Sequence, residues 1–338
     1  MTQADDLVRL SGVSRSTVFR FLKGDSVRPQ AREAILAAMQ HLNISHDDHA
    51  VHKGKTLQIR IRKDFKAFKG YNLAMAGFVS RAEKHGFAIT IQTGTIRDSA
   101  DPSERKPPTR PAGVLILGMS IEEEEVESGY FREAGIPHVF VNRVFEDPKK
   151  SWVSCLLRQA ACEATGYLLD LGHRDIGTWG VVSSSRIDRE KRLGYFDAFR
   201  LRGLEPSGPC LEMDTHGTLP EAAERLIAAG DLPSAWFCPS DEHALQLYRT
   251  AREKGVRIPE DLSVVSMDDV ESAEYLMPPL TTVRMPFQAE GAVAFDVLKH
   301  LMENPAVESH HVVLKHELII RDSCAPHGDR SGDRSGDD

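Results

Sequence analysis

In the first 42 residues, apolar positions recur with the period of an α-helix, and the pattern predicts three short helices. Gly12 breaks the first helix, and Ser14 is a suitable N-cap for a second helix that ends near Leu22. Pro29 suits the first turn of a third helix, which ends near Leu42. The side chains expected to face the interior of this bundle are Leu7, Val8, Leu10, Val18, Phe21, Leu22, Ala31, Ile35, Ala38, Met39 and Leu42.

The second helix leaves polar and basic side chains on its outer side. A short basic helix that is held by a neighbouring helix can place its first turn against base edges in the major groove. The alternative is an ordinary helical pair whose Arg and Lys side chains are simply solvated. The pattern favours a helix-turn-helix, and its candidate DNA-contacting residues are Ser14, Arg15, Ser16, Thr17, Phe19, Arg20 and Lys23.

From Leu57 onward, segments of strand length alternate with amphipathic helices, an order typical of a mainly parallel, doubly wound sheet. Strands are expected at residues 57–61, 88–91, 113–117, 139–141, 176–182, 211–213, 235–238, 262–266 and 281–285. The expected helices include 71–85, 159–171, 189–201, 221–229 and 243–254. Two consecutive sets predict two lobes with a cleft between them. The first strand is unusual, because it alternates where a central parallel strand should be continuously apolar.

At 338 residues, the chain is long enough for two or three domains. We predict an α plus α/β architecture with a DNA-binding domain at 1–45, a linker at 46–56 and a two-lobed sensor at 57–325. The first lobe would comprise about 57–150 and 286–315, and the second about 151–285 and 316–325. The tail at 326–338 repeats GDRS and is expected to be disordered.

The formal net charge of −8 is distributed unevenly along the chain. Residues 1–62 hold ten Lys or Arg and six Asp or Glu, a net charge of +4, so the remainder carries −12. This asymmetry fits a small basic head that is drawn to phosphate and a larger acidic body that is repelled by it.

Cysteine usage and motif searches exclude several other classes of protein. The five cysteines have no metal-ligand spacing, which indicates reduced thiols and predicts no metal or cofactor. The sequence contains no phosphate-binding loop, nucleophile elbow or zinc-protease motif, so we expect no catalytic residues and no enzyme. It also lacks an apolar run of about 18 residues, so we expect a cytoplasmic protein with no membrane partner, associated with the nucleoid when bound to DNA.

Residues 4–24 closely resemble the amino-terminal motif D-V-A-x-x-A-G-V-S-x-x-T-V-S-R-x-L-N-G of the lac repressor/galactose repressor (LacI/GalR) family. The second half carries further motifs of this family in the same order. They are L-G-H-R-x-I at 171–176, S-D-x-x-A at 240–244, G-x-x-x-P-x-D-x-S-V-V at 255–265, D-D at 268–269, P-P-L-T-T-V at 278–283 and L-x-x-R-x-S at 318–323. The resemblance implies a transcriptional regulator, most simply a repressor, with a periplasmic-binding-protein-like sensor.

The resemblance also implies roles for the residues of the second helix. Arg15 and Ser16 stand at the positions that read base edges, where an Arg–guanine pair discriminates by about 1–3 kcal/mol. Thr17 and Arg20 would contact phosphates or base edges, and Ser14 would cap the helix. Phe19 departs from the family, which usually has Ser; it could contact a thymine methyl group or simply cover the helix.

For the effector, the resemblance points to the cleft between the lobes. Asp268 matches a family carboxylate that accepts hydrogen bonds from sugar hydroxyls, whereas Asp241 could contact the ligand or only cap a helix. Lys191 occupies the register of the Arg in the family motif R-x-x-G-[FY], with Arg192 one place on. Ser240 completes the candidate effector set. The expected effector is a sugar, an acidic sugar or a sugar phosphate, and the additional cations suit the acidic sugar and the sugar phosphate equally.

The linker departs from the family pattern, in which a Leu wedges into the minor groove. Residues 45–55 offer only Val51 as a wedge, and Asp47 and Asp48 would oppose phosphate. Its histidines could respond to pH, or the segment could be a solvated linker.

The expected partners are double-stranded operator DNA, a small-molecule effector and a second copy of the chain. Three alternatives stay open on the sequence: a solute-binding protein without DNA specificity, an α/β enzyme that uses the cleft carboxylates, and a ligand-independent regulator.

Overall fold

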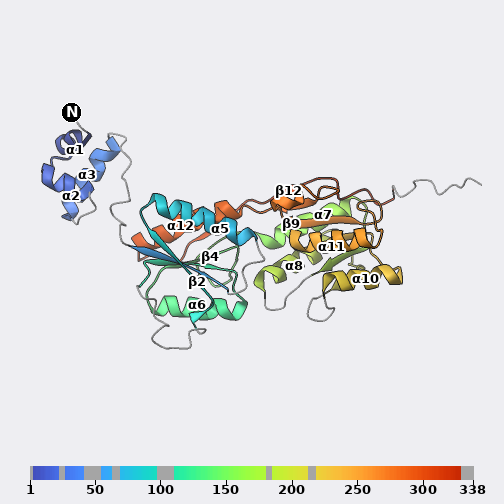
Figure 1. The fold of residues 1–338 in the computed structure, drawn as a ribbon. Coiled ribbons are helices and arrows are strands. Elements are labelled where there is room, and N and C mark those ends of the chain that lie inside the picture. The colour runs from blue at the N-terminus through green and yellow to red at the C-terminus, as the bar shows by residue number, and fades with distance from the viewer. Residues whose placement is uncertain are drawn as a thin grey trace, which may run out of the picture.

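The computed structural model describes residues 3–22, 27–41, 55–62, 69–96, 110–179, 185–211 and 218–328. It contains a three-helix bundle and two α/β lobes, as the sequence pattern predicts (Figure 1). Residues 46–54 of the predicted linker lie outside the described residues, as do Lys23, residues 97–109 and the GDRS tail beyond residue 328.

The amino-terminal bundle consists of α1 (Gln3–Ser11), α2 (Arg15–Leu22) and α3 (Pro29–His41). Its core is formed by Leu7, Val18, Phe21, Ile35, Ala38 and Met39, all of them predicted. Leu10 is 44% exposed, so its predicted place in the core is wrong. The buried side of α1 passes through positions 7, 8 and 11, and Leu10 lies at the edge of that side. The side chains of Leu22 and Leu42 lie outside the described set.

Lobe 1 is built on a six-stranded sheet in the order β11-β5-β4-β3-β1-β2. Its strands are parallel and comprise β1 (Thr56–Ile61), β2 (Ala88–Thr93), β3 (Gly113–Leu117), β4 (His138–Val141), β5 (Trp152–Cys155) and β11 (His311–Leu314). The helices α5 (Lys69–Lys84) and α12 (Phe287–Glu303) share one apolar core with the sheet, and α6 (Ile121–Glu133) packs in a second core.

The alternating pattern of β1 has a structural explanation. Leu57, Ile59 and Ile61 face the core beneath α5 and α12. The intervening Arg60 is 1% exposed, and its guanidinium donates to both carboxylate oxygens of Glu127 on α6, at 3.0 and 3.1 Å. The strand is therefore buried on both faces, but one face is stabilised by a paired charge instead of apolar side chains.

Lobe 2 has the same architecture, with the strand order β12-β10-β9-β8-β6-β7. The strands are β6 (Ile176–Trp179), β7 (Cys210–Leu211), β8 (Ala235–Phe237), β9 (Ser263–Asp268), β10 (Thr281–Arg284) and β12 (Glu317–Ile319), of which β12 is antiparallel to β10. The helices α7 (Leu157–Asp170) and α8 (Arg186–Arg200) pack in one core, and α10 (Leu219–Ala229) and α11 (Asp241–Glu253) in the other. A short 3-10 helix, η3 (Glu271–Ala273), follows β9.

The chain crosses between the lobes after β5, after β10 and after β11. The predicted lobe boundary at residue 151 is therefore misplaced, because Trp152–Cys155 forms a buried strand of lobe 1. Cys155 therefore ends β5, whereas Cys162 lies on α7. The ordered chain also continues past residue 325, since the N–H of His327 donates to the carbonyl of Leu171 at 2.8 Å.

Candidate functional site

The start of α2 is organised by Ser14. Its hydroxyl accepts a hydrogen bond from the backbone N–H of Thr17 at 3.3 Å, which is the predicted N-cap. The same hydroxyl lies 2.8 Å from the hydroxyl of Thr17 and 3.1 Å from that of Ser16. Three short polar side chains are thus held together at the positively polarised end of the helix, a favourable place for a phosphate.

The outer side of α2 carries the larger candidate DNA-contacting residues. Val18 and Phe21 fix the helix in the bundle, which leaves Arg15, Phe19 and Arg20 exposed. The Arg15 guanidinium lies over the ring of Phe19, 5.7 Å from its centroid, and Phe19 is 40% exposed. An exposed aromatic ring is compatible with either predicted role of Phe19.

Three residues at the carboxyl ends of strands have positive φ angles. Asn142 follows β4 with φ of 58°, Asp268 ends β9 with φ of 117°, and Asp269 follows it with φ of 52°. Such conformations are costly for residues other than glycine and are concentrated at functional sites. Asp269 is fixed by Arg284 and Arg321, each of which donates to its carboxylate at 2.7 Å.

Asp268 and Lys191 form a buried pair in lobe 2. The Nζ of Lys191 lies 3.6 Å from Asp268 Oδ1 and donates to the carbonyl of Pro239. Asp268 is 4% exposed, and its Oδ1 has no hydrogen-bond partner within the described part of the chain. Burial raises the pKa of Asp268 to about 7, and the Lys191 cation opposes that rise. A buried carboxylate with an unused acceptor is suited to binding a hydroxyl or amino group of a ligand.

Asp241 has a different environment. Its carboxylate accepts hydrogen bonds from the hydroxyls of Ser266 and Thr282, the latter at 2.7 Å, and from the backbone N–H of Val270 at 2.8 Å. Burial raises its pKa to about 6 despite these donors. The contacts tie the start of α11 to β9 and β10, which favours the structural alternative for Asp241.

Two other predicted effector residues also have contacts within lobe 2. Ser240 is the N-cap of α11, and its hydroxyl lies 2.9 Å from Nδ1 of His243. Arg192 lies over the ring of Phe196, 5.6 Å from its centroid. The structure therefore brings together Lys191 and Asp268, whereas Arg192 packs against the next turn of its own helix.

The junction of the lobes contains a cluster that the sequence analysis missed. Glu124 at the start of α6 pairs with Arg143, which follows β4, and with Arg186 at the start of α8. Tyr71 hydrogen-bonds Arg143 and contributes to raising its pKa. These residues are separated by up to 115 positions in the chain, and no short motif contains them, so periodicity and spacing offered no signal.

The raised pKa values of Asp241 and Asp268 predict the sign of a pH effect. In the folded protein, the carboxyl of Asp241 keeps its proton up to about pH 6 and that of Asp268 up to about pH 7. In an unfolded chain, both carboxyls lose their protons at about pH 4. The free energy of unfolding is thus expected to fall as the pH rises between these values. In calorimetric melts at about pH 5 and about pH 8, Asp268→Asn should lose less thermal stability than the wild-type protein. Equal losses in both proteins would contradict a buried ionisation at Asp268.

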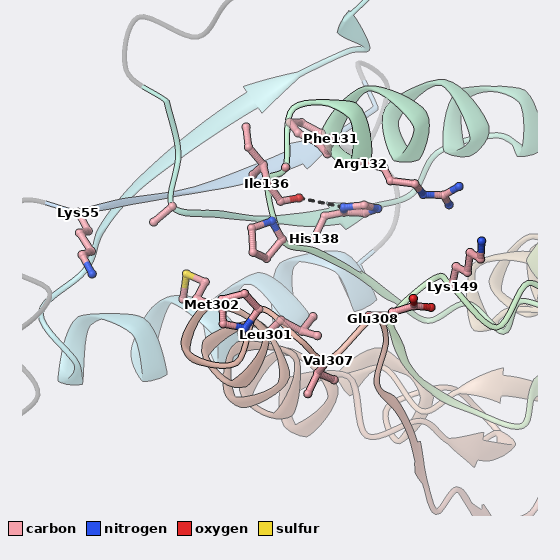
Figure 2. Close-up of a pocket in the computed structure, with 15 residues that line it drawn as sticks. Lys55, Phe131, Arg132, Ile136, His138, Lys149, Leu301, Met302, Val307 and Glu308 are labelled. Carbon is pink, nitrogen blue, oxygen red and sulfur yellow. Dashed lines mark hydrogen bonds between the residues drawn. The ribbon is translucent and has the colours of Figure 1, made fainter.

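A pocket of about 680 Å³ lies in lobe 1, at the edge of the sheet where its strands begin (Figure 2). Phe131, Ile136 and Leu301 contribute apolar walls, and Lys55 lies at one end, next to the segment that leads to the helical bundle. Burial lowers the pKa of His138 to about 4, so this lining residue is neutral at pH 7. None of the predicted effector residues lines this pocket.

Comparisons with known proteins agree with this architecture. Residues 165–324 match the periplasmic binding protein-like domain. The helix-turn-helix-type transcriptional repressor PurR of Photobacterium profundum is 26% identical over 333 residues, which cover 96% of this chain and 98% of PurR. The solved structure of the transcriptional regulator CelR in complex with cellobiose has a TM-score of 0.70 and 26% identity, covering 96% of this chain and 100% of that one.

The relatives are helix-turn-helix-type transcriptional repressors and the solved neighbours include CelR, which agrees with the resemblance to the lac repressor/galactose repressor family. The lac repressor dimer bound to operator and the anti-inducer ONPF has the same fold, with a TM-score of 0.70 at 22% identity over 96% of this chain and 99% of that one. Over nearly the full length of the chain its relatives are transcriptional repressors, which places the protein among transcriptional regulators and not among enzymes.

Two further expectations concern metals and membranes. Within the described ranges, no group of three or more His, Cys, Asp or Glu side chains is placed to hold a metal ion. None of the described helices combines the length and the apolar character that a bilayer-crossing helix needs.

Proposed function

We propose that this regulator is a repressor that binds an inverted-repeat operator as a homodimer through α2, and that an effector bound between the lobes controls its operator affinity. The observation that carries the proposal is the exposed set Arg15, Phe19 and Arg20 on a helix fixed by buried Val18 and Phe21. A single helix-turn-helix reads one half-site, so a two-fold dimer matches a palindromic operator. The solved lac repressor dimer on its operator supports this arrangement.

For the effector, we propose a polyhydroxylated molecule that contacts Asp268 and Lys191. The unused acceptor on Asp268 can take a hydroxyl hydrogen, and the adjacent Lys191 ammonium can donate to a second oxygen. The cellobiose bound to CelR supports a sugar-like ligand. Asn142 follows β4 of lobe 1 and Asp268 ends β9 of lobe 2, and both have positive φ angles. These angles support a binding role for the carboxyl ends of the two strands, because local strain requires stabilisation from the surrounding fold.

Selection of binding sequences from a random duplex library tests the DNA-binding proposal. The full-length protein is expected to enrich an inverted repeat, and Arg15→Ala should lose preference at one position of each half-site, at a cost of about 1–3 kcal/mol. Arg32→Ala is the control, since Arg32 is an exposed arginine of the same bundle but lies on α3. No enriched repeat at low salt, or an identical preference in Arg15→Ala, would refute the role of α2.

A further inference from the structure

An ion pair joins the first turns of α6 in lobe 1 and α8 in lobe 2. Nε of Arg186 donates to Oε2 of Glu124 at 3.1 Å, while Oε1 of the same carboxylate accepts from Nε of Arg143. The side chain of Glu124 is 1% exposed, that of Arg143 is 4% exposed and that of Arg186 is 23% exposed. A single buried carboxylate is therefore shared between an arginine of its own lobe and one of the other lobe.

An aromatic ring of lobe 1 also contacts Arg186. The guanidinium lies 4.8 Å from the ring centroid of Phe145, and Nζ of Lys150 lies 4.7 Å from the same centroid. Lys150 in turn pairs with Glu125, the residue after Glu124. Arg186 is thus attached to lobe 1 through both a carboxylate and a ring face, an arrangement that favours arginine over lysine.

The two arginines differ in how firmly they are held. Arg143 also donates to the carbonyls of Met119 and Asn142, at 3.1 and 2.9 Å, so it is fixed within lobe 1. The contacts of Arg186 with the described residues are those to Glu124 and Phe145 across the junction. If Arg186 moves away, Glu124 keeps Arg143 as its partner, and no buried carboxylate is left without a cation.

We propose that Arg186 is an anion sensor at the lobe junction: a ligand that carries a carboxylate or phosphate group takes the guanidinium from Glu124 and so releases lobe 2 from lobe 1. This inference rests on the proposed function only in placing the effector between the lobes. Guanidinium groups pair with both kinds of anion through two parallel hydrogen bonds, which Glu124 does not use here. Lys191 of the same helix supplies a second cation beside Asp268.

The acidic residues nearby are compatible with an anionic ligand. Burial raises the pKa of Asp188 and that of Asp268, in the latter case to about 7. Asp268 can therefore take up a proton when an anion binds, which limits the repulsion between its carboxyl and the ligand.

Isothermal titration calorimetry of the full-length protein tests this inference with four probes at constant ionic strength. They are inorganic phosphate, D-glucose 6-phosphate, D-glucuronate and the neutral counterpart D-glucose. Glu124→Gln retains an oxygen that can accept from Arg143 but loses the charge that competes for Arg186. It is expected to bind at least one anionic probe about tenfold more tightly than wild type. The phosphate and carboxylate probes distinguish the two kinds of anion.

Glu125→Gln is the matched control, because Glu125 pairs with Lys150 and not with Arg186. The affinity of this variant for the anionic probes should equal that of the wild-type protein. Arg186→Gln should lower the affinity for the same anion about tenfold or more. Arg189→Gln changes an exposed residue of the same helix and should leave that affinity unchanged. If Glu124→Gln unfolds at too low a temperature to be titrated, the comparison of Arg186→Gln with Arg189→Gln tests the inference.

Equal affinities in wild type, Glu124→Gln and Arg186→Gln would overturn the inference. So would D-glucose binding as tightly as the charged sugars, or no anion binding to any variant. Operator binding is measured separately without ligand. A protein that binds no operator would refute the proposed function, while the calorimetric result for Arg186 would still stand.

Discussion

Glu127→Ala is expected to lower the stability of lobe 1 by about 3–5 kcal/mol, because it leaves a buried guanidinium without its carboxylate. Glu127 is fully buried and accepts two hydrogen bonds from Arg60 and a third from the N–H of Ile96, at 2.7 Å. The loss should appear in calorimetry as a fall of about 6 °C or more in the melting temperature of the lobe.

Two comparisons separate the buried pair from a general effect of mutation on α6. Glu133→Ala removes an exposed carboxylate from the end of the same helix and should change the melting temperature little. The double variant Arg60→Met with Glu127→Leu removes both charges and should recover much of the loss, since apolar residues can replace a buried ion pair. A melting temperature for Glu127→Ala equal to that of Glu133→Ala would contradict the prediction.

The same pair shows why parts of lobe 1 were hard to derive from the sequence. The alternation in β1 suggested an unusual central strand, and the structure explains it by a charge on α6, 67 residues away. On α6 itself, Glu124 and Glu127 occupy buried positions, so the apolar period that identifies a helix is interrupted. Pairing between distant residues satisfies these charges, and a single sequence does not reveal which residues are partners.

Elements with strong local signals were predicted well. The bundle α1–α3 has apolar spacing, a Ser cap and a Gly break, and β3 at Gly113–Leu117 is a continuous apolar run. The strands β5, β11 and β12 were missed, because each has only three or four residues and two of them lie at sheet edges with half-exposed side chains. Their omission also displaced the predicted boundary between the lobes.

The candidate effector site was only partly predictable for a related reason. Motif register identified Lys191 and Asp268, both in lobe 2, and the structure places them 3.6 Å apart. The lobe 1 side of the junction includes Glu124, Arg143 and Tyr71, which belong to no motif found in the sequence. These residues come from α5, from α6 and from the segment after β4, and their relative position depends on the whole fold.

Asp268→Asn is expected to weaken the effector response about tenfold or more while leaving operator affinity without ligand unchanged. A hydrogen bond to a charged acceptor contributes about 1.5–3 kcal/mol, and the neutral amide keeps the size of the side chain but loses the charge. The measurement is release of the selected operator as a function of ligand concentration. The ligand is whichever sugar, uronate or sugar phosphate in a fixed panel releases the wild-type protein.

Asp231→Asn provides the matched control for this result. Asp231 is an exposed residue that precedes β8, at the amino-terminal edge of the same sheet, so the identical chemical change there should leave the response intact. Because coupling between effector and operator is reciprocal, bound operator should lower the affinity of the wild-type protein for the effector. The same reduction should be seen in Asp268→Asn at the higher ligand concentrations that this variant needs. An unshifted release curve for Asp268→Asn would place the effector away from Asp268. Reduced operator affinity without ligand would instead show that Asp268 stabilises the DNA-binding arrangement of the lobes.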